Sequence, residues 1–233
     1  RANALAVLSG LASEDKYPVI QDVLTNVQNS SPYMEKYVLD ALCEMDRMDL
    51  AQARIKDRYA NMVEGPDAYS TLWEFWDRYA GTKNHAWTGG PLITMSKYMA
   101  GVAPITPGYD TYQVKPDMGS LNQINTVVPS IKGNINVAIN RDTENNTFDL
   151  SLTSPANTQA IVAIPRMDGN TRVAVGGTVL FENGMSTGAA VSGITYQSND
   201  KDYIYFQAEP GSYAFHADVK PAGTDSEYTL NIE

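Results

Sequence analysis

The stretch IKGNINVAINRDTENNTFDLSL, residues 131–152, decides the fold of the second half of the chain. Apolar or small residues stand at every second position of its two outer parts: Ile131, Gly133, Ile135, Val137, Ile139, Phe148, Leu150 and Leu152. This period of two is typical of strands that bury one face. The polar run from Asp142 to Asn146 is rich in turn-forming residues, so the stretch predicts two antiparallel strands joined by a turn.

More strands are expected on the C-terminal side of this stretch, because turn signals continue at short intervals. They are Asp168-Gly169-Asn170, Gly176-Gly177, Asn183-Gly184 and Ser198-Asn199-Asp200. Two late strands are expected at Tyr203–Phe206 and Tyr213–Phe215, with Pro210-Gly211 as the turn between them. The alternating aromatic residues there are expected to belong to the core. This regular rhythm predicts an antiparallel β-sandwich. The polar end after Pro221 is expected to be a loose tail.

Before about residue 105 the apolar residues recur with helical spacing instead. The best-marked helix carries the apolar face from Met34 to Met45, because Ser31 is a suitable N-cap and Pro32 suits the first helical position. Further helices are expected at residues 2–8, 17–27, 51–62, 72–76 and 91–99, the second opened by Ser13 and the last ended by Gly101.

The first and last of these helical segments are apolar on nearly every side, which requires neighbours all round them. Six helices with two such members are typical of an incomplete assembly. The chain also begins directly in an apolar helical pattern at Arg1, with no initiator Met and no cap, as expected for a cut inside a domain. We predict an α plus β chain in two domains, with helices over residues 1–106 and a jelly-roll-like sandwich over residues 107–233.

Composition and charge exclude several classes of protein. With 43% hydrophobic and 19% charged residues, the chain can bury a core and is not a disordered composition. Its 17 basic and 27 acidic residues give a formal charge of −10, the wrong sign for binding a nucleic-acid backbone. No apolar run is long enough to span a membrane, and no signal peptide is visible. An export signal, if there is one, would lie upstream.

The single cysteine, Cys43, cannot form a disulfide within the chain. It stands in a helical apolar pattern, where a free cysteine is typically a buried, inert thiol rather than a nucleophile. We therefore expect Cys43 to belong to the helical core.

Functional side chains are densest in TLWEFWD, residues 71–77, and KNHAWTGG, residues 83–90. A carboxylate, an imidazole and several indoles stand here within a short distance along the chain. Sites that process sugars use this mixture, because carboxylates carry out acid–base chemistry at the glycosidic bond while indole rings cover the apolar faces of sugars.

Each of these residues also has a structural reading. The spacing Thr71-x-x-Glu74 is that of a helix capping box, and spacing alone favours the cap. His85 alone is more typical of a hydrogen-bonded structural histidine, and tryptophans are more often core residues than sugar platforms. With only His216 elsewhere, no metal cluster is predicted. Because no phosphate-binding or dinucleotide-binding glycine motif is found, no cofactor is predicted either.

The order of several short motifs resembles the alpha-L-rhamnosidases. The segment TLWEFW at residues 71–76 is followed by Asn84-His85 with a glycine soon after, then by MAGVAP at residues 99–104 and by Pro107-Gly108. The upstream Ser31-Pro32-Tyr33 and the late PGSYAF at residues 210–215 are also similar to family segments. The resemblance spans most of the chain and favours Glu74 as a catalyst.

The resemblance implies the end of a six-hairpin (α/α)6 barrel followed by the sandwich, and hydrolysis with inversion. Glu74 matches the family's general base, and His85 matches a histidine that contacts the sugar. Trp76 and Trp87 are candidate sugar contacts, although family likeness there can reflect barrel packing. The family's general acid lies in an earlier barrel segment and has no counterpart here, so the chain alone is expected to be inactive. The loop between Glu74 and His85 looks shorter than is common in the family.

The resemblance implies a rhamnose-containing glycan or glycoside as the substrate, and the missing N-terminal part of the same polypeptide as the partner. A secreted or periplasmic location is favoured over the cytoplasm. A second hypothesis, from another class, makes the sandwich a carbohydrate-binding or structural module. A third is a helical-barrel glycosidase for another deoxy sugar, such as fucose, since barrel architecture does not fix the sugar.

Overall fold

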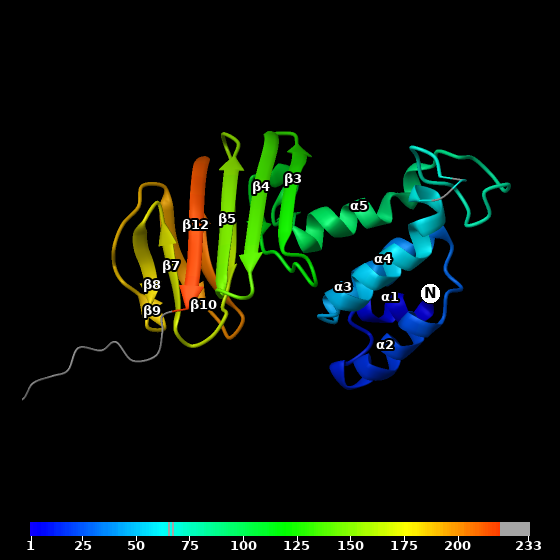
Figure 1. Cartoon of the computed structure of the whole chain (residues 1–233), viewed down its shortest axis with the longest axis horizontal. Coiled ribbons are helices and arrows are strands. Elements are labelled where there is room, and N and C mark those ends of the chain that lie inside the picture. The colour runs from blue at the N-terminus through cyan, green and yellow to red at the C-terminus, as the bar shows by residue number, and fades with distance from the viewer. Residues whose placement is uncertain (65, 67, 220–233) are drawn as a thin grey trace, which may run out of the picture. The chain divides into compact units, whose positions relative to one another are not determined.

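The computed structural model describes residues 1–64, 66 and 68–219 (Figure 1). The predicted loose tail after Pro221 lies outside these residues. The chain divides into two compact units. Of the described residues, the first comprises Arg1–Ala103 and Lys115–Leu121, and the second comprises Pro104–Val114 and residues 122–219. The class is α plus β, with helices in the first unit and two largely antiparallel sheets in the second.

Most of the predicted helices are present in the first unit. Its α-helices are α1 (Ala2–Leu8), α2 (Tyr17–Asn26), α3 (Pro32–Glu44), α4 (Met48–Val63) and α5 (Gly90–Thr94), and its short 3-10 segments are Glu14–Lys16 and Ala86–Gly89. Ser31 is the N-cap of α3 and accepts a hydrogen bond from the Met34 N–H, as predicted. Ser13 precedes the first 3-10 segment rather than α2, and its hydroxyl bonds to the Asp15 carboxylate.

Two helical predictions need correction. Residues 72–76 form no helix, because the Glu74 N–H donates across the loop to the Thr82 carbonyl rather than to a residue four positions earlier. The helix predicted over residues 91–99 is α-helical only up to Thr94. Met95–Met99 continue it as a π-helical turn, in which the Ala100 N–H bonds to the Met95 carbonyl.

A buried ion pair joins α3 to α4. Glu35 is fully buried and Arg54 nearly so, and the guanidinium of Arg54 donates to both carboxylate oxygens of Glu35. Arg54 also donates to the carbonyl of Leu24 in α2, and Ser30 donates to Glu35. The pair is therefore hydrogen-bonded on all sides, as buried charges must be.

Several apolar side chains of α1 and of the α5 segment are exposed in this chain. Leu5, Leu92, Ile93 and Met95 are each between 41% and 63% exposed. The sequence predicted that both segments need neighbours all round, and these side chains have no such cover within the described residues.

The second unit holds two sheets, apart from Val102 and Ala103 of the first strand, which belong to the first unit. The five-stranded sheet has the order β1 (Val102–Pro104), β2 (Thr111–Val114), β6 (Gln159–Pro165), β11 (Tyr203–Ala208), β10 (Ile194–Asn199). The seven-stranded sheet has the order β3 (Gln123–Ser130), β4 (Gly133–Asp142), β5 (Thr147–Ser154), β12 (Gly211–Val219), β7 (Thr171–Val175), β8 (Thr178–Glu182), β9 (Met185–Ser186). Most of the predicted turns lie between these strands, but Ser198 and Asn199 are the last residues of β10 and Gly211 is the first residue of β12. The seven-stranded sheet is antiparallel throughout, as are the pairs β6–β11 and β11–β10. Strands β2 and β6 are parallel because the chain runs through β3–β5 of the other sheet between them.

The deciding stretch forms the hairpin β4–β5, in which Ile139 pairs with Leu150 and Val137 with Leu152. These side chains are buried. Ile131 is not part of the strand. It lies in the turn before β4 and is 84% exposed, because the Ser130 hydroxyl accepts from the Lys132 N–H and donates to the Gly133 carbonyl, which closes a tight turn there.

The core of the second unit lies between its two sheets. Phe206 of β11 and Phe215 of β12 are buried, and their ring centroids are 5.6 Å apart. These two aromatic residues are core residues, as predicted. Tyr203 and Tyr205 are only partly buried, because they alternate with Ile204 and Phe206 and point to the outer face. Tyr213 is also only partly buried, although it lies on the same face of β12 as Phe215.

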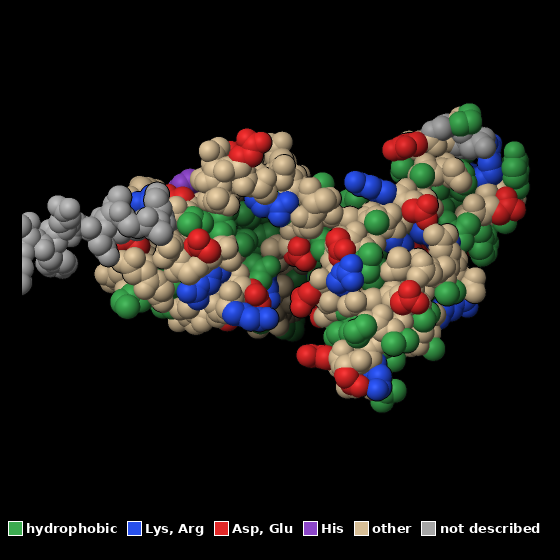
Figure 2. Space-filling model, turned by 60° about the horizontal axis from the view of Figure 1, so that its bottom comes forward, with side chains coloured by type: hydrophobic (Ala, Val, Ile, Leu, Met, Phe, Trp, Pro, Cys, Tyr) green, Lys and Arg blue, Asp and Glu red, His purple; other side chains and the backbone are tan. Residues whose placement is uncertain are grey.

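None of the described helices combines the length and the apolar character that crossing a bilayer requires. Figure 2 shows acidic and basic side chains interspersed on the face in view, without one large basic patch. This surface agrees with the net charge of −10.

Candidate active site

The loop of residues 71–88 in the first unit consists of two backbone stretches that hydrogen-bond to each other. The Glu74 N–H donates to the Thr82 carbonyl at 3.0 Å, and the His85 N–H donates to the Leu72 carbonyl at 3.1 Å. These bonds bring Glu74 and His85, which are separated in sequence, onto adjoining stretches.

Two threonine hydroxyls strengthen this pairing. Thr71 donates to the carbonyl of Lys83, and the fully buried Thr88 donates to the carbonyl of Trp73 at 2.6 Å. Thr71 is therefore not a helix N-cap, and the Glu74 carboxylate is engaged elsewhere. The capping-box reading, which spacing alone favoured, is wrong at this site.

The Glu74 carboxylate is held through one of its two oxygens. Oε2 accepts from the Thr82 N–H at 2.9 Å and from the Thr82 hydroxyl at 3.1 Å. The Nδ1 atom of His85 lies 3.0 Å from that hydroxyl and 3.6 Å from Oε2. Glu74, Thr82 and His85 thus form one hydrogen-bonded group, while Oε1 accepts no hydrogen bond from the described residues.

The same contacts set the protonation of Glu74. The hydrogen bond from the Thr82 N–H holds the pKa of the Glu74 carboxyl below its ordinary value, and the Thr82 hydroxyl and His85 act in the same direction. Hydrogen bonds to the charged form favour that form. Glu74 is therefore a carboxylate at neutral pH, which is the state that a general base needs and a general acid does not.

His85 stacks on Trp87. The ring centroids are 4.0 Å apart at an interplanar angle of 42°, and the Trp87 indole N–H points to the Glu74 carbonyl oxygen at 3.4 Å. Trp87 is 43% exposed, and its other neighbour is the half-exposed Tyr33 of α3, with centroids 5.5 Å apart. The structure therefore brings three of the predicted residues together, Glu74, His85 and Trp87.

Trp76 has a different environment from these three. Its indole N–H donates to the Ser30 carbonyl at 2.7 Å, and the Arg58 guanidinium lies 4.1 Å from the ring centroid. It packs against the buried cluster that contains Tyr59 and Trp73. One face of the Trp76 ring is thus occupied by protein, and its role as a sugar contact stays a prediction.

Three neighbours of this site were not among the predicted site residues. Thr82 and Gly81 carry no periodic or motif signal, since a threonine after a glycine in a polar loop is ordinary turn composition. Tyr33 was noted only as part of the segment Ser31-Pro32-Tyr33, which is similar to a family segment. The pairing of residues 71–74 with residues 82–85 places Gly81 and Thr82 at the site, and their sequence does not specify it. Tyr33 reaches the site only through its ring contact with Trp87.

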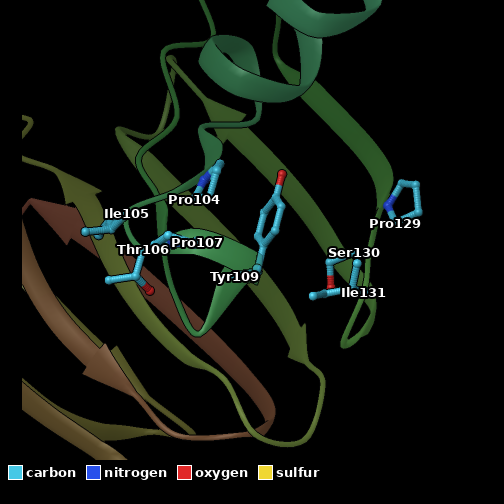
Figure 3. A pocket seen from close by; sticks show the side chains of 9 residues that line it. Pro104, Ile105, Thr106, Pro107, Tyr109, Pro129, Ser130 and Ile131 are labelled. Atoms are coloured by element: carbon cyan, nitrogen blue, oxygen red, sulfur yellow. The ribbon is translucent and has the colours of Figure 1, made fainter.

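The second unit has a cavity of its own, with a volume of about 630 Å³. It is lined by Pro104–Tyr109 and Pro129–Ile131. Figure 3 shows the Tyr109 ring standing between the first of these segments and Ser130 and Ile131 of the second. Tyr109 has a φ of 62°, which is uncommon for an aromatic residue. The lining contains no carboxylate or imidazole, and Tyr109 is its one titratable side chain.

Solved alpha-L-rhamnosidase structures have a similar fold. The enzyme from Dictyoglumus thermophilum matches with a TM-score of 0.76 and 21% identity over 93% of this chain and 25% of its own. The enzyme from Streptomyces avermitilis, solved with L-rhamnose, matches with a TM-score of 0.64 and 18% identity over 92% of this chain and 21% of its own. The enzyme from Aspergillus terreus matches with a TM-score of 0.61 and 15% identity over 92% of this chain and 23% of its own. At these identities the likeness shows the fold, and the chain spans about a quarter of each relative or less.

Helices followed by a two-sheet unit thus correspond to one part of a larger glycoside hydrolase fold. Residues 101–178 match the family model described as bacterial alpha-L-rhamnosidase C-terminal domain. Together with the structural matches, this confirms the resemblance to the C-terminal portion of the alpha-L-rhamnosidases that the sequence motifs indicated. No curated protein matches the sequence.

Proposed function

We propose that this chain is the C-terminal part of an inverting glycoside hydrolase that removes alpha-L-rhamnose from glycans or glycosides. Glu74 is the general base. The observation that carries this proposal is that only one oxygen of the Glu74 carboxylate is hydrogen-bonded by the described residues. Oε2 accepts from Thr82, while Oε1 is available to accept a proton from water. The low pKa of the Glu74 carboxyl supports the same role.

Inversion requires a second carboxyl group about 6.5–9.5 Å from the base, so that a water molecule fits between the base and the anomeric carbon. In this proposal the general acid comes from a part of the polypeptide outside this chain. His85 contacts the sugar through its imidazole, and Trp87 and Trp76 are proposed sugar contacts. The chain by itself is inactive.

We propose further that residues 1–106 complete an (α/α)6 barrel with the remainder of the polypeptide, and that residues 107–233 are the domain that follows it. The exposed apolar side chains of α1 and of the α5 segment support this, because exposed apolar faces mark surfaces that pack on a partner. A secreted or periplasmic location is part of the proposal, and cell fractionation tests it.

The test of function uses the full-length polypeptide that contains this chain. Replacing Glu74 with Gln should lower kcat on an aryl alpha-L-rhamnoside by roughly 100-fold or more, the usual contribution of a positioned acid or base. The matched control is Glu64→Gln, which removes an exposed carboxylate in the same unit. Near-normal turnover of the Glu74 variant would remove the base from the proposal. Higher activity on an aryl alpha-L-fucoside would favour the alternative deoxy-sugar glycosidase.

A carbohydrate-binding role for the second unit is the other candidate function. The observation that favours it is Tyr109, which lines the cavity and has a left-handed backbone conformation, because strained backbone clusters at ligand sites and aromatic rings cover sugar faces. A glycan array probed with the full chain and with Tyr109→Ala tests it. Binding that disappears in the variant supports the role, and no binding by either leaves a structural one.

A further inference from the structure

The contacts of Thr82 fix where the protons lie in the site. A threonine hydroxyl has one proton to donate, and an ionised carboxylate can only accept. The Thr82 hydroxyl lies 3.1 Å from Glu74 Oε2 and 3.0 Å from His85 Nδ1. If its proton pointed to His85, two lone pairs would face each other across the 3.1 Å contact with Glu74. The proton therefore points to Glu74, and the hydroxyl oxygen must accept from His85.

This assignment has a consequence for the imidazole. A neutral histidine carries its proton on one nitrogen, and the other nitrogen is an acceptor. Because Nδ1 must donate to the Thr82 hydroxyl, Nδ1 holds the proton and Nε2 has a free lone pair. The placement of Nδ1 3.6 Å from the anionic Oε2 favours the same tautomer. The stack on Trp87, with centroids 4.0 Å apart, restricts rotation of the ring away from this arrangement.

We propose that Thr82 is a positioning residue, which holds Glu74 as a proton acceptor and fixes His85 as the Nδ1–H tautomer, so that Nε2 accepts a hydrogen bond from a sugar hydroxyl. This inference rests on the proposed function only for the identity of the ligand. The ligand class is a sugar whose hydroxyl at this position donates. An analogue that lacks this hydroxyl, or carries a methoxy group in its place, has no proton to offer and is rejected.

A site built to pair a substrate hydroxyl discriminates strongly against an analogue without it, because the site's polar group is then left unpaired. Discrimination by His85 depends on the tautomer, and the tautomer depends on the Thr82 hydroxyl. Thr82 therefore affects substrate choice without touching the substrate. Serine retains this hydroxyl, whereas valine has the same shape without it.

The first experiment measures the tautomer directly. The full chain, labelled with ¹⁵N-histidine, is studied by NMR at about pH 8, above the ordinary histidine pKa of about 6.5. We expect His85 to carry its proton on Nδ1 in the unchanged chain and in Thr82→Ser, and to lose this preference in Thr82→Val. His216, whose Nδ1 lies 2.6 Å from the Asp149 carboxylate, is the internal reference and should not change. A proton on Nε2 of His85 in the unchanged chain overturns the proposal, as does an unchanged tautomer in Thr82→Val.

The second experiment uses the full-length polypeptide and compares the aryl rhamnoside with its singly O-methylated analogues. Thr82→Val should raise KM for the parent substrate. It should also reduce, by about tenfold or more, the preference in kcat/KM for the parent over the analogue that is methylated at the hydroxyl bound by His85. Thr82→Ser should keep both the KM and the preference of the unchanged enzyme. Equal preference in all three proteins contradicts the role in selectivity. The tautomer measurement needs no activity. An incorrect assignment of Glu74 as the base would appear in kcat of Glu74→Gln, whereas an incorrect role for Thr82 would appear in the His85 tautomer.

Discussion

A Cβ atom on Gly81 would lie 2.6 Å from the Oε2 atom of Glu74, closer than such atoms approach in real proteins. Gly81 also has a φ of 65°, in the left-handed region that other residues adopt only at a cost. The glycine therefore makes room for the carboxylate and allows the turn that brings Thr82 to it.

The Gly81→Ala variant should displace Glu74 and lower kcat of the full-length enzyme by about 10- to 100-fold, because small displacements of a catalytic group have effects of this size. The measurement is kcat on the aryl rhamnoside together with a circular dichroism spectrum. The control is Gly89→Ala, where a Cβ meets nothing within 4 Å and φ is −68°. Equal activities of the two variants would show that the carboxylate tolerates the added methyl group.

The buried pair of Glu35 and Arg54 should contribute strongly to the stability of the helical unit. Arg54→Met leaves the buried Glu35 carboxylate with only the Ser30 hydroxyl and, at 3.9 Å, the Arg58 guanidinium, and breaking such buried pairs destabilises proteins by about 3–5 kcal/mol. Urea denaturation followed by circular dichroism measures this as a lower midpoint.

The matched control for that variant is Lys16→Met, which breaks the exposed pair with Asp15. Exposed pairs contribute only about 0–1 kcal/mol. A similar midpoint for both variants would mean that Arg58 or water stabilises the Glu35 carboxylate once Arg54 is gone.

Cys43 should be unreactive in the folded chain. Burial, followed by the nearby carboxylates of Asp40, Asp117 and Glu44, raises the pKa of its thiol to about 12. At pH 8 roughly one thiol in ten thousand is then ionised, and only the thiolate attacks disulfide reagents. We expect slow reaction with such a reagent in buffer and fast reaction in urea. Fast reaction in buffer would indicate that α3 opens locally.

Sequence patterns predicted much of the fold because they act locally. The Ser31-Pro32 start of α3 and the alternation in β4 and β5 each report on the residues beside them, and the structure confirms both. Ile131 continues the same alternation and was misassigned, because the turn that exposes it is closed by the neighbouring Ser130 hydroxyl.

Features that join distant segments were not predictable in the same way. Glu35 and Arg54 look like ordinary polar helix residues in the sequence, and only the packing of α3 on α4 makes them a buried pair. The motif TLWEFW pointed to Glu74, but its spacing suggested a helix. The cross-loop bonds to Thr82 and His85 replaced that helix with the candidate site.

The pH dependence of activity provides the last test of Glu74. A carboxyl whose pKa is lowered in the folded protein remains ionised further into acid, so a base of this kind loses activity only as the pH falls through that lowered value. The contribution of its hydrogen bonds to stability follows the same sign: it is present above the ordinary glutamate pKa and is lost as the pH falls through the folded value.

We therefore expect the acid limb of kcat/KM for the full-length enzyme to lie below the ordinary glutamate value of 4.5. In Thr82→Val the backbone N–H remains but the hydroxyl is lost. The midpoint of the acid limb should therefore move toward pH 4.5 without reaching it. A limb above 4.5 in the unchanged enzyme would assign the acid-side ionisation to a different group.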